Sequence, residues 1–298
     1  TARLPATFGT RDDFMNPVLC ALQEPDIRPE VGLACQAAYK GMVEHTDGLV
    51  GRVRRAFGAF VGGRRTPHLF GYLSDHGDTI GEHGVFGKKT FFEKSVKIPL
   101  LLAGTGVAAG RRWDEPVSIL DVGPTVCAWA GAETPERADG QSLASILRGE
   151  DGPRGRAVLS ESMDKGPDGR WTYGCMARRG TYKFITYHGY ESQNMLFDVA
   201  ADPLEQNNLA AARPGMCEEF RWLLRQATDP AAAEALQAQH TKRARVLAAF
   251  EKQTGYDDRE RYRDYPEEAK RPPEVCVTSL VGGPGKEQSS VYHGLPLR

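Results

Sequence analysis

An aspartate and a histidine stand side by side after a short apolar segment, where they could bind a metal ion. The segment, residues 69–73, lies between Pro67 and Gly77 and is typical of a buried strand. Carboxylate oxygens suit a hard divalent cation, and an imidazole nitrogen can add to such a site. In open α/β sheets, ligands bind beyond the carboxyl ends of the strands, which is where Asp75 and His76 would lie.

Two lysines and a second acid–histidine pair follow in the next loop. Lys88 or Lys89 could hold an anion against a cation as a point charge, and Glu82 and His83 come just before them. A second apolar run, residues 98–103, predicts another buried strand. By residue type alone, an Asp-His-Gly sequence after a strand is more often an ordinary hydrogen-bonded turn than a metal site.

The element before this stretch is predicted to be a long helix over residues 29–60. Apolar side chains recur there at helical spacing and would face one side. They are Met42, Val43, Leu49, Val50, Val53, Phe57 and Phe60. Further on, Asp121 is the expected cap of a helix that ends at Ala130, just before Gly131.

The second half of the chain changes character after a charged, glycine- and proline-rich boundary at residues 150–156. Short apolar runs alternate there with turn residues and predict a small antiparallel sheet. The runs are residues 157–160, 175–178, 182–187 and 195–199. Two helices are expected after them, over residues 214–228 and 231–253.

Composition limits the classes of partner. With 298 residues, a net charge of −1 and 26% charged residues, the chain shows no sign of binding nucleic acid or an anionic membrane. No apolar run approaches the roughly 20 residues of a membrane span. The six cysteines lack CxxC spacing, which argues against a zinc cluster and a disulfide framework. We expect a soluble protein, and the cytoplasm, the periplasm and secretion all stay open.

Several short motifs in residues 35–210 together resemble the type I sulfatases of the alkaline phosphatase superfamily. The motifs are Ser74-Asp75-His76-Gly77, Gly81-Glu82-His83-Gly84, Gly87-Lys88, Thr90-Phe91-Phe92-Glu93, Val96-Lys97-Ile98-Pro99-Leu100, Leu196-Phe197-Asp198 and Asp202-Pro203. The resemblance implies that Asp75 and His76 bind a divalent cation, Ca²⁺ in preference to Mg²⁺ or Mn²⁺. It also implies that Lys88 contacts the sulfate and takes part in catalysis. Lys89 is a second substrate-binding candidate, and His83 is a second catalytic candidate.

The same resemblance implies an α/β fold of the alkaline-phosphatase-like sulfatase type. Residues 1–150 would form the C-terminal portion of the catalytic domain, with part of a central mixed sheet flanked by helices. Residues 151–255 would form a smaller C-terminal subdomain with an antiparallel sheet and helices. Residues 256–298 would be an irregular extension.

One family hallmark is absent from these 298 residues. Type I sulfatases carry a Cys-x-Pro-x-Arg or Ser-x-Pro-x-Arg motif whose first residue becomes the formylglycine nucleophile, and the sequence contains neither motif. The resemblance places that motif, and two aspartates that complete the metal site, in an N-terminal half. We therefore expect this chain to be a C-terminal part that is inactive without the missing N-terminal half as its partner.

Three functions fit these observations. The leading one is a metal-dependent sulfuric ester hydrolase, with a sulfate ester as substrate. A phosphodiesterase or phosphonate monoester hydrolase of the same superfamily is the second, and a truncated cation-binding protein without catalytic activity is the third. The identity of the ester, the role of residues 256–298 and the existence of a homo-oligomer stay open.

Overall fold

The structure is a computed structural model that describes residues 28–64, 66–165 and 171–254. The chain divides into two compact units, one that ends at Glu234 and one that begins at Ala235. The first unit contains the predicted site residues. Residues 1–27 and 255–298 lie outside the described residues, and with them the irregular extension expected over residues 256–298. The division at residues 150 and 255 stays a prediction.

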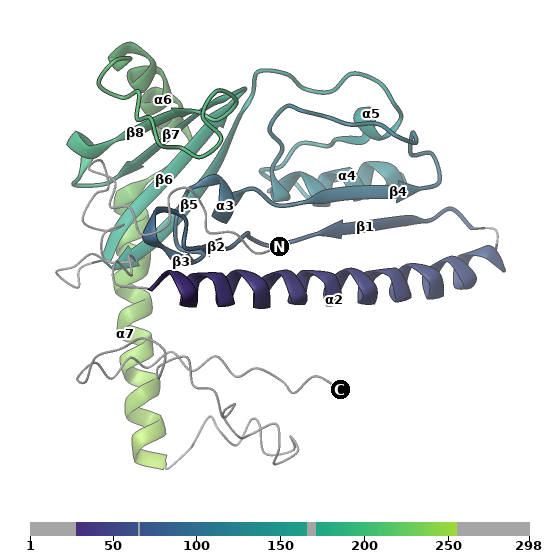
Figure 1. Cartoon of the computed structure of the whole chain (residues 1–298), viewed down its shortest axis with the longest axis horizontal. Helices are drawn as coiled ribbons and strands as arrows, with labels where there is room; N and C mark the ends of the chain where they lie inside the picture. The colour runs from purple at the N-terminus through teal and green to yellow at the C-terminus, as the bar shows by residue number, and fades with distance from the viewer. Residues whose placement is uncertain (1–27, 65, 166–170, 255–298) are drawn as a thin grey trace. The chain divides into compact units, whose positions relative to one another are not determined.

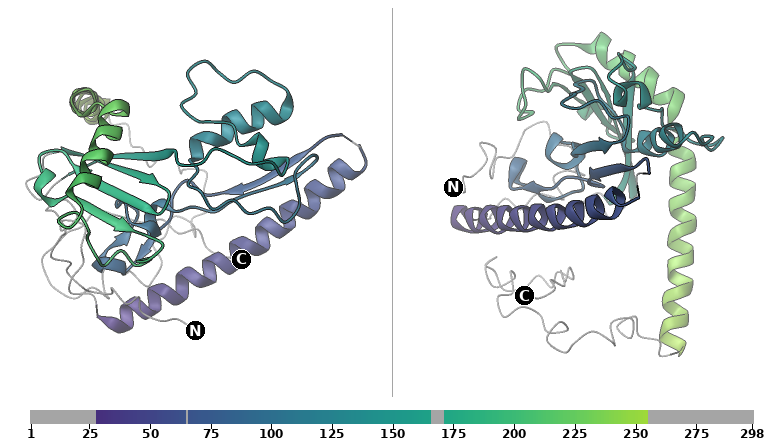
Figure 2. Two further views of the ribbon diagram at one scale, coloured as in Figure 1. Left: turned by 90° about the horizontal axis from the view of Figure 1, so that it is seen from above. Right: turned by 90° about the vertical axis from the view of Figure 1, so that its right-hand side faces the viewer.

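A long helix, α2 (Pro29–Gly62), confirms the predicted helix and extends it by two residues. It runs alongside the strand pair β1–β4 (Figures 1 and 2). Its buried residues lie mainly near its start, where Gln36 donates a hydrogen bond to the carbonyl of Ile80 at 2.8 Å. Near its end, the ring of Phe57 contacts those of His68 and Phe70. The predicted apolar side is largely exposed between these contacts, as Met42 and Val53 show with 57% and 59% exposure.

Strands β1 (Leu69–Leu73) and β4 (Leu100–Gly104) form an antiparallel pair in which Leu73 lies opposite Leu100. Both predicted strands are present, but the prediction that they are buried is wrong. Leu101 is 60% exposed and Leu73 is 36% exposed. The reason is that neither strand has another strand neighbour within the described residues.

The segment between β1 and β4 folds into several very short elements. They are β2 (Thr79–Ile80), the 3₁₀ turn η1 (Glu82–Gly84), β3 (Phe86–Gly87) and α3 (Glu93–Val96). β2 and β3 pair with each other, so the chain turns back on itself between them. Lys88 and Lys89 follow β3 directly and precede α3.

After β4, the chain enters α4 (Val122–Ala130) through a 3₁₀ turn, η2 (Ile119–Asp121), and later forms α5 (Ala144–Leu147). Asp121 stands at the predicted N-cap position of α4, but its side chain makes no cap hydrogen bond there and instead completes the capping box of η2, which begins at Ser118. Ser118 accepts a hydrogen bond from the amide of Leu120, while Asp121 accepts one from the amide of Ser118 at 2.8 Å. The helix does end at Gly131 in the left-handed conformation, with φ of 71°.

The predicted C-terminal sheet is a four-stranded antiparallel meander in the order β5–β6–β7–β8. Its strands are β5 (Ala157–Lys165), β6 (Trp171–Arg179), β7 (Tyr182–Tyr187) and β8 (Met195–Asp198). A further 3₁₀ turn, η3 (Glu191–Gln193), joins the last two. The meander follows from the short turn-separated runs, because consecutive antiparallel strands need only tight connections.

This sheet lies between two apolar layers and forms the core of the first unit. On one face, α6 (Pro214–Ala227) contributes Cys217, Phe220 and Leu224. On the other face, the segment that carries Lys88 contributes Val85, Phe91 and Phe92. The C-terminal sheet therefore supports the loop that holds the candidate site lysines.

The last helix, α7 (Pro230–Thr254), corresponds to the helix predicted over residues 231–253. Leu236, Val246, Leu247 and Phe250 on it are each at least 60% exposed. In the part of the chain that the structure describes, no helix combines the length and apolar character that crossing a membrane requires.

Candidate functional site

The turn after β1 holds Asp75 and His76 in a defined arrangement. Ser74 Oγ donates to the carbonyl of His76 at 2.6 Å, and the His76 amide donates to Asp75 Oδ1 at 3.0 Å. His76 Nδ1 lies 2.8 Å from the Gly77 carbonyl, an acceptor, so in this contact Nδ1 carries the proton. In the neutral ring, Nε2 then keeps its lone pair.

That lone pair faces a carboxylate oxygen, since His76 Nε2 lies 3.4 Å from Asp75 Oδ2. Two electron-rich atoms at this distance repel each other unless a proton or a cation lies between them. Both side chains are accessible, with 82% of the Asp75 side chain and 37% of the His76 side chain exposed. The two donor atoms thus fit part of the shell of a divalent cation.

Gly77 locks this turn against α3. Its amide donates to the carbonyl of Ser95 at 2.7 Å. A Cβ at position 77 would lie only 2.1 Å from the carbonyl oxygen of Lys94, which is too close for any side chain. Close approach of two backbone segments is therefore the reason why glycine follows Asp75-His76.

The charge state of Asp75 suits a cation ligand. Desolvation acts to raise the pKa of Asp75, but the hydrogen bonds from the amides of His76 and of Asp75 itself and the positive charge of Lys88 outweigh it. The pKa of Asp75 is therefore below its usual value. The neighbouring Asp78 behaves in the opposite way, because burial raises its pKa.

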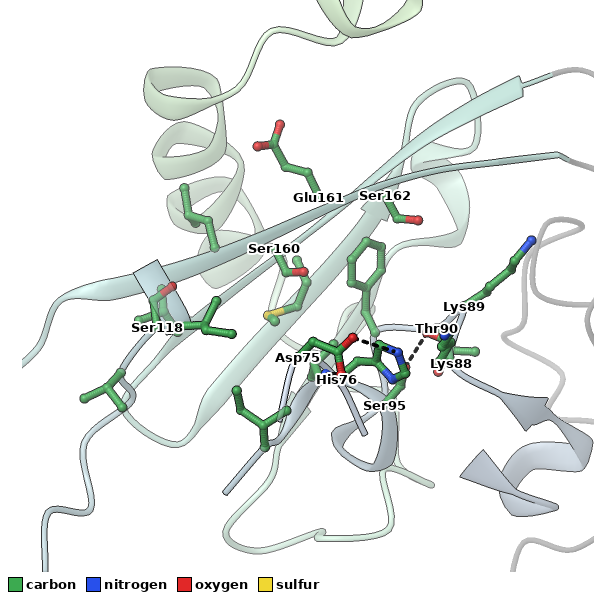
Figure 3. A pocket seen from close by; sticks show the side chains of 18 residues that line it. Asp75, His76, Lys88, Lys89, Thr90, Ser95, Ser118, Ser160, Glu161 and Ser162 are labelled. Atoms are coloured by element: carbon green, nitrogen blue, oxygen red, sulfur yellow. Dashed lines mark hydrogen bonds and ion pairs between the residues drawn. The ribbon is translucent and has the colours of Figure 1, made fainter. Parts of the chain in front are cut away.

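Lys88 reaches the site through a glycine that adopts a backbone conformation open to few other residues. Gly87 has φ of 103°, and the Lys88 carbonyl accepts a hydrogen bond from Ser95 Oγ at 2.6 Å. Lys88 is exposed, and no carboxylate among the described residues forms an ion pair with it. Lys89 differs: its Nζ lies 3.7 Å from Asp164 Oδ1, and its side chain points away from Asp75 and His76 (Figure 3).

These residues line a pocket of about 270 Å³ together with residues from β5. Ser160 and Ser162 lie on the side of β5 that faces Asp75 and His76 (Figure 3), and the Ser162 hydroxyl donates a hydrogen bond to the carboxylate of Asp164. Glu161 points to the other side of β5, where the hydroxyl of Tyr173 donates to it. The sequence did not single out this pair of serines, because the predicted strand ended at residue 160 and so excluded Ser162. The period-two alternation of a longer strand would have placed them on one face.

His83 lies apart from this pocket, in the interior. It is 2% exposed, and its ring stacks on that of Phe92 with centroids 4.0 Å apart. Its Nε2 donates to the carbonyl of Leu204 at 3.1 Å, which fixes the proton on that nitrogen in this contact. The structure thus brings Asp75, His76, Lys88 and Lys89 to one pocket, and it does not bring His83 there.

The described residues supply only part of a metal site. Nowhere in residues 28–254, outside the short gaps given above, do three His, Cys, Asp or Glu side chains form a group that could hold an ion. Ca²⁺ commonly takes about six to eight oxygen ligands. A cation bound by Asp75 and His76 would need its remaining ligands from water, substrate or other residues.

Comparisons with known proteins match most of this chain to sulfatases. The model of the Sulfatase family matches residues 11–132, and the model described as N-sulphoglucosamine sulphohydrolase, C-terminal, matches residues 81–226. Arylsulfatase K from Danio rerio is 33% identical to this chain over 206 residues. The match covers 65% of this chain and 37% of that protein, so the chain spans well under half the length of this relative.

Solved structures show the same likeness. A putative sulfatase from Bacteroides thetaiotaomicron VPI-5482 superposes with a TM-score of 0.64 and 26% identity, covering 76% of this chain and 52% of the other. A phosphonate monoester hydrolase from Silicibacter pomeroyi gives a TM-score of 0.60 and 25% identity, covering 76% and 49%. The fold is therefore the α/β fold that the sequence motifs predict. From its motifs, its fold and these matches, the chain belongs to the sulfatase family.

Proposed function

We propose that this chain provides the cation-binding and sulfate-binding part of a sulfuric ester hydrolase. One observation carries the proposal: the adjacent residues Asp75 and His76 line the same pocket as Lys88, which follows them in the next loop. A carboxylate–imidazole pair that shares a pocket with an ammonium group is suited to a cation and an anion that bind together.

Each residue has a defined part in this proposal. Asp75 and His76 hold a divalent cation, preferably Ca²⁺, with Mg²⁺ or Mn²⁺ as alternatives. When bound, the cation draws charge from the sulfate oxygens. The Lys88 ammonium lies against another sulfate oxygen and stabilises the charge that grows there during ester cleavage. Ser160 faces the same pocket and can hydrogen-bond to the substrate beyond the sulfate group, whereas the Ser162 hydroxyl donates to Asp164.

The nucleophile comes from outside these 298 residues in this proposal. The sequence lacks both forms of the formylglycine motif, and the described residues provide two candidate ligand atoms for the cation. We propose that an N-terminal half supplies the formylglycine and the remaining metal ligands. The chain by itself then binds cation and sulfate but does not turn over.

Hydrolysis of phosphonate monoesters is a second candidate function. The similarity to the phosphonate monoester hydrolase structure favours it, and Lys88 could pair with a tetrahedral phosphonate as well as with a sulfate. Rates of the intact gene product on a sulfate ester and on a phosphonate monoester, measured side by side, separate the two. Faster cleavage of the sulfate ester supports the leading proposal.

Calorimetric titration of the chain with Ca²⁺, followed by sodium sulfate, tests the proposal directly. Asp75→Asn should weaken Ca²⁺ binding by about tenfold or more, because it removes the charge of one ligand. Lys88→Ala should weaken sulfate binding to the Ca²⁺-loaded chain by a similar factor.

Two variants serve as matched controls. Asp114→Asn changes an exposed aspartate that pairs with Arg112, and Lys89→Ala removes the lysine that faces Asp164. Neither should weaken binding as much as Asp75→Asn or Lys88→Ala. Wild-type Ca²⁺ affinity in Asp75→Asn together with wild-type sulfate affinity in Lys88→Ala would refute the proposal.

A further inference from the structure

A buried cluster of four charged side chains joins the site loop to the C-terminal sheet. Lys183, on β7, is fully buried, and its Nζ lies 3.1 Å from Glu93 Oε1 and also contacts Glu205. Arg178, its cross-strand neighbour on β6, pairs with Glu93 Oε2 at 2.7 Å. Two cations thus meet two carboxylates, so the buried cluster is electrically balanced.

The cluster also reaches the backbone at the start of α3. Glu205 Oε2 accepts a hydrogen bond from the amide of Glu93 at 2.6 Å. Glu205 has φ of 55°, in the left-handed region that non-glycine residues rarely adopt. This conformation is kept although it is unfavourable, which shows that the surrounding contacts hold residue 205 firmly.

A second contact fixes the other end of the same loop. His83 donates to the carbonyl of Leu204, the residue just before Glu205, and it also has a left-handed φ of 53°. The turn at residues 204–205 therefore holds the site segment at residue 83 and again at residue 93. Lys88 lies halfway between these two points.

The loop between the two contacts is packed on its inner side and open on its outer side. Val85, Phe91 and Phe92 are at most 4% exposed and pack with Met176 and Phe197 of the C-terminal sheet. Lys88 is exposed on the outer side, in the pocket. Apolar packing alone tolerates small shifts, whereas paired charges with backbone hydrogen bonds impose a more exact geometry.

We propose that Lys183 and Glu205 are positioning residues that hold residues 84–92 so that Lys88 faces Asp75 and His76 across the pocket. His83 acts with them at the other end of the loop. The inference rests on the sulfate-binding role proposed for Lys88. It assigns to the C-terminal sheet a direct part in the alignment of the anion-binding residue.

Hydrogen exchange and sulfate titration of the whole chain test this proposal. Glu205→Gln removes the charge but keeps a similar side-chain volume. We expect it to speed amide exchange in residues 84–92 by about tenfold or more and to weaken sulfate binding by a similar factor. Exchange in β5 and in α6 should stay at the wild-type rate.

Two controls separate positioning from general stability. Glu219→Gln changes an exposed carboxylate that pairs with Arg179, and it should alter neither measurement. Leu224→Ala truncates the core on the α6 side of the sheet. It should lower the unfolding temperature without weakening sulfate binding. If Glu205→Gln does not fold, His83→Gln provides the same two measurements at the other end of the loop.

The outcomes are distinct. Wild-type exchange in residues 84–92 together with wild-type sulfate affinity in Glu205→Gln, or in His83→Gln where that variant replaces it, would overturn this inference. Unchanged sulfate affinity in Lys88→Ala would count against the proposed function, and the exchange rates would still decide whether the cluster holds the loop.

Discussion

At the scale of single residues, the candidate site depends on a few positions where substitution would disturb the local geometry. Asp75 and His76 are held by hydrogen bonds within one turn, and Gly77 permits the backbone of that turn to touch α3. Gly87 then gives Lys88 its place. Both positions favour glycine for different reasons: a Cβ at Gly77 would collide with the Lys94 carbonyl oxygen, whereas Gly87 has a φ of 103° that other residues rarely adopt.

Gly77→Ala should therefore disrupt both the site and the fold. The added methyl group would collide with the Lys94 carbonyl oxygen, and overpacking of this kind costs about 1–3 kcal/mol. We expect a lower free energy of unfolding in urea and weaker Ca²⁺ binding. Gly123→Ala in α4, where nothing lies within 4 Å of the added atom, is the control and should be neutral or stabilising. Equal stability of the two variants would contradict this account.

At the scale of elements, the four-stranded sheet organises the first unit. One of its faces packs on α6 and the other on the site segment. The region around α4 has a separate anchor at Asp121, which is 1% exposed. Asp121 accepts hydrogen bonds from the amides of Ser118 and Gln141, each at 2.8 Å, and pairs with Arg156. One carboxylate thus joins three segments.

Asp121→Ala should be strongly destabilising. It leaves two amides without their acceptor and the Arg156 guanidinium, whose side chain is 17% exposed, without its partner. Breaking a buried ion pair on one side costs about 3–5 kcal/mol. Asp114→Ala, which breaks an exposed pair with Arg112, should cost far less, because solvent screens that pair. Urea unfolding followed by circular dichroism measures both values, and a similar loss in both variants would be the contrary result.

At the scale of the described chain, the two halves of the first unit are joined by polar as well as apolar contacts. Glu93 comes from the site segment, while Lys183, Arg178 and Glu205 come from the C-terminal sheet and the turn after it. Burial alone would raise the pKa of Glu93, but Lys183 and Arg178 outweigh it and lower the pKa of Glu93 below its ordinary value of 4.5. For Glu205, burial prevails and raises the pKa.

This cluster should make stability depend on pH in a specific way. Because the pKa of Glu93 is lower in the folded state, its contribution is full above pH 4.5 and is lost as the pH falls through the folded pKa. Glu205 acts in the opposite direction, so its contribution declines as the pH rises above 4.5 through its folded pKa. Unfolding free energies measured across this range for wild type and Glu93→Gln test the prediction. The acid-side loss should shrink in the variant, and identical curves would exclude this role for Glu93.

From the sequence alone, most helices and strands could be placed, and Asp75, His76 and Lys88 could be named as site candidates. These features are local. Helices and strands follow from the spacing of apolar residues over a few turns, and the site motifs are runs of two to five residues. The resemblance of these motifs to a family then predicted the fold, because the motifs occur in a fixed order.

Tertiary structure alone decided which candidates share a pocket. His83 is close in sequence to Lys88, yet its partner is Leu204, 121 positions away, and the contact takes it into the interior. In the sequence, Lys183 looks like an ordinary strand residue. In the structure it is buried, and its ammonium group pairs with Glu93, 90 positions earlier in the chain, and with Glu205. The apolar residues of β1 and β4 predict buried strands. Burial, however, depends on neighbouring strands and helices from other parts of the chain, which a local pattern does not specify. Contacts between distant segments decide such points, and a short run of residues does not specify them.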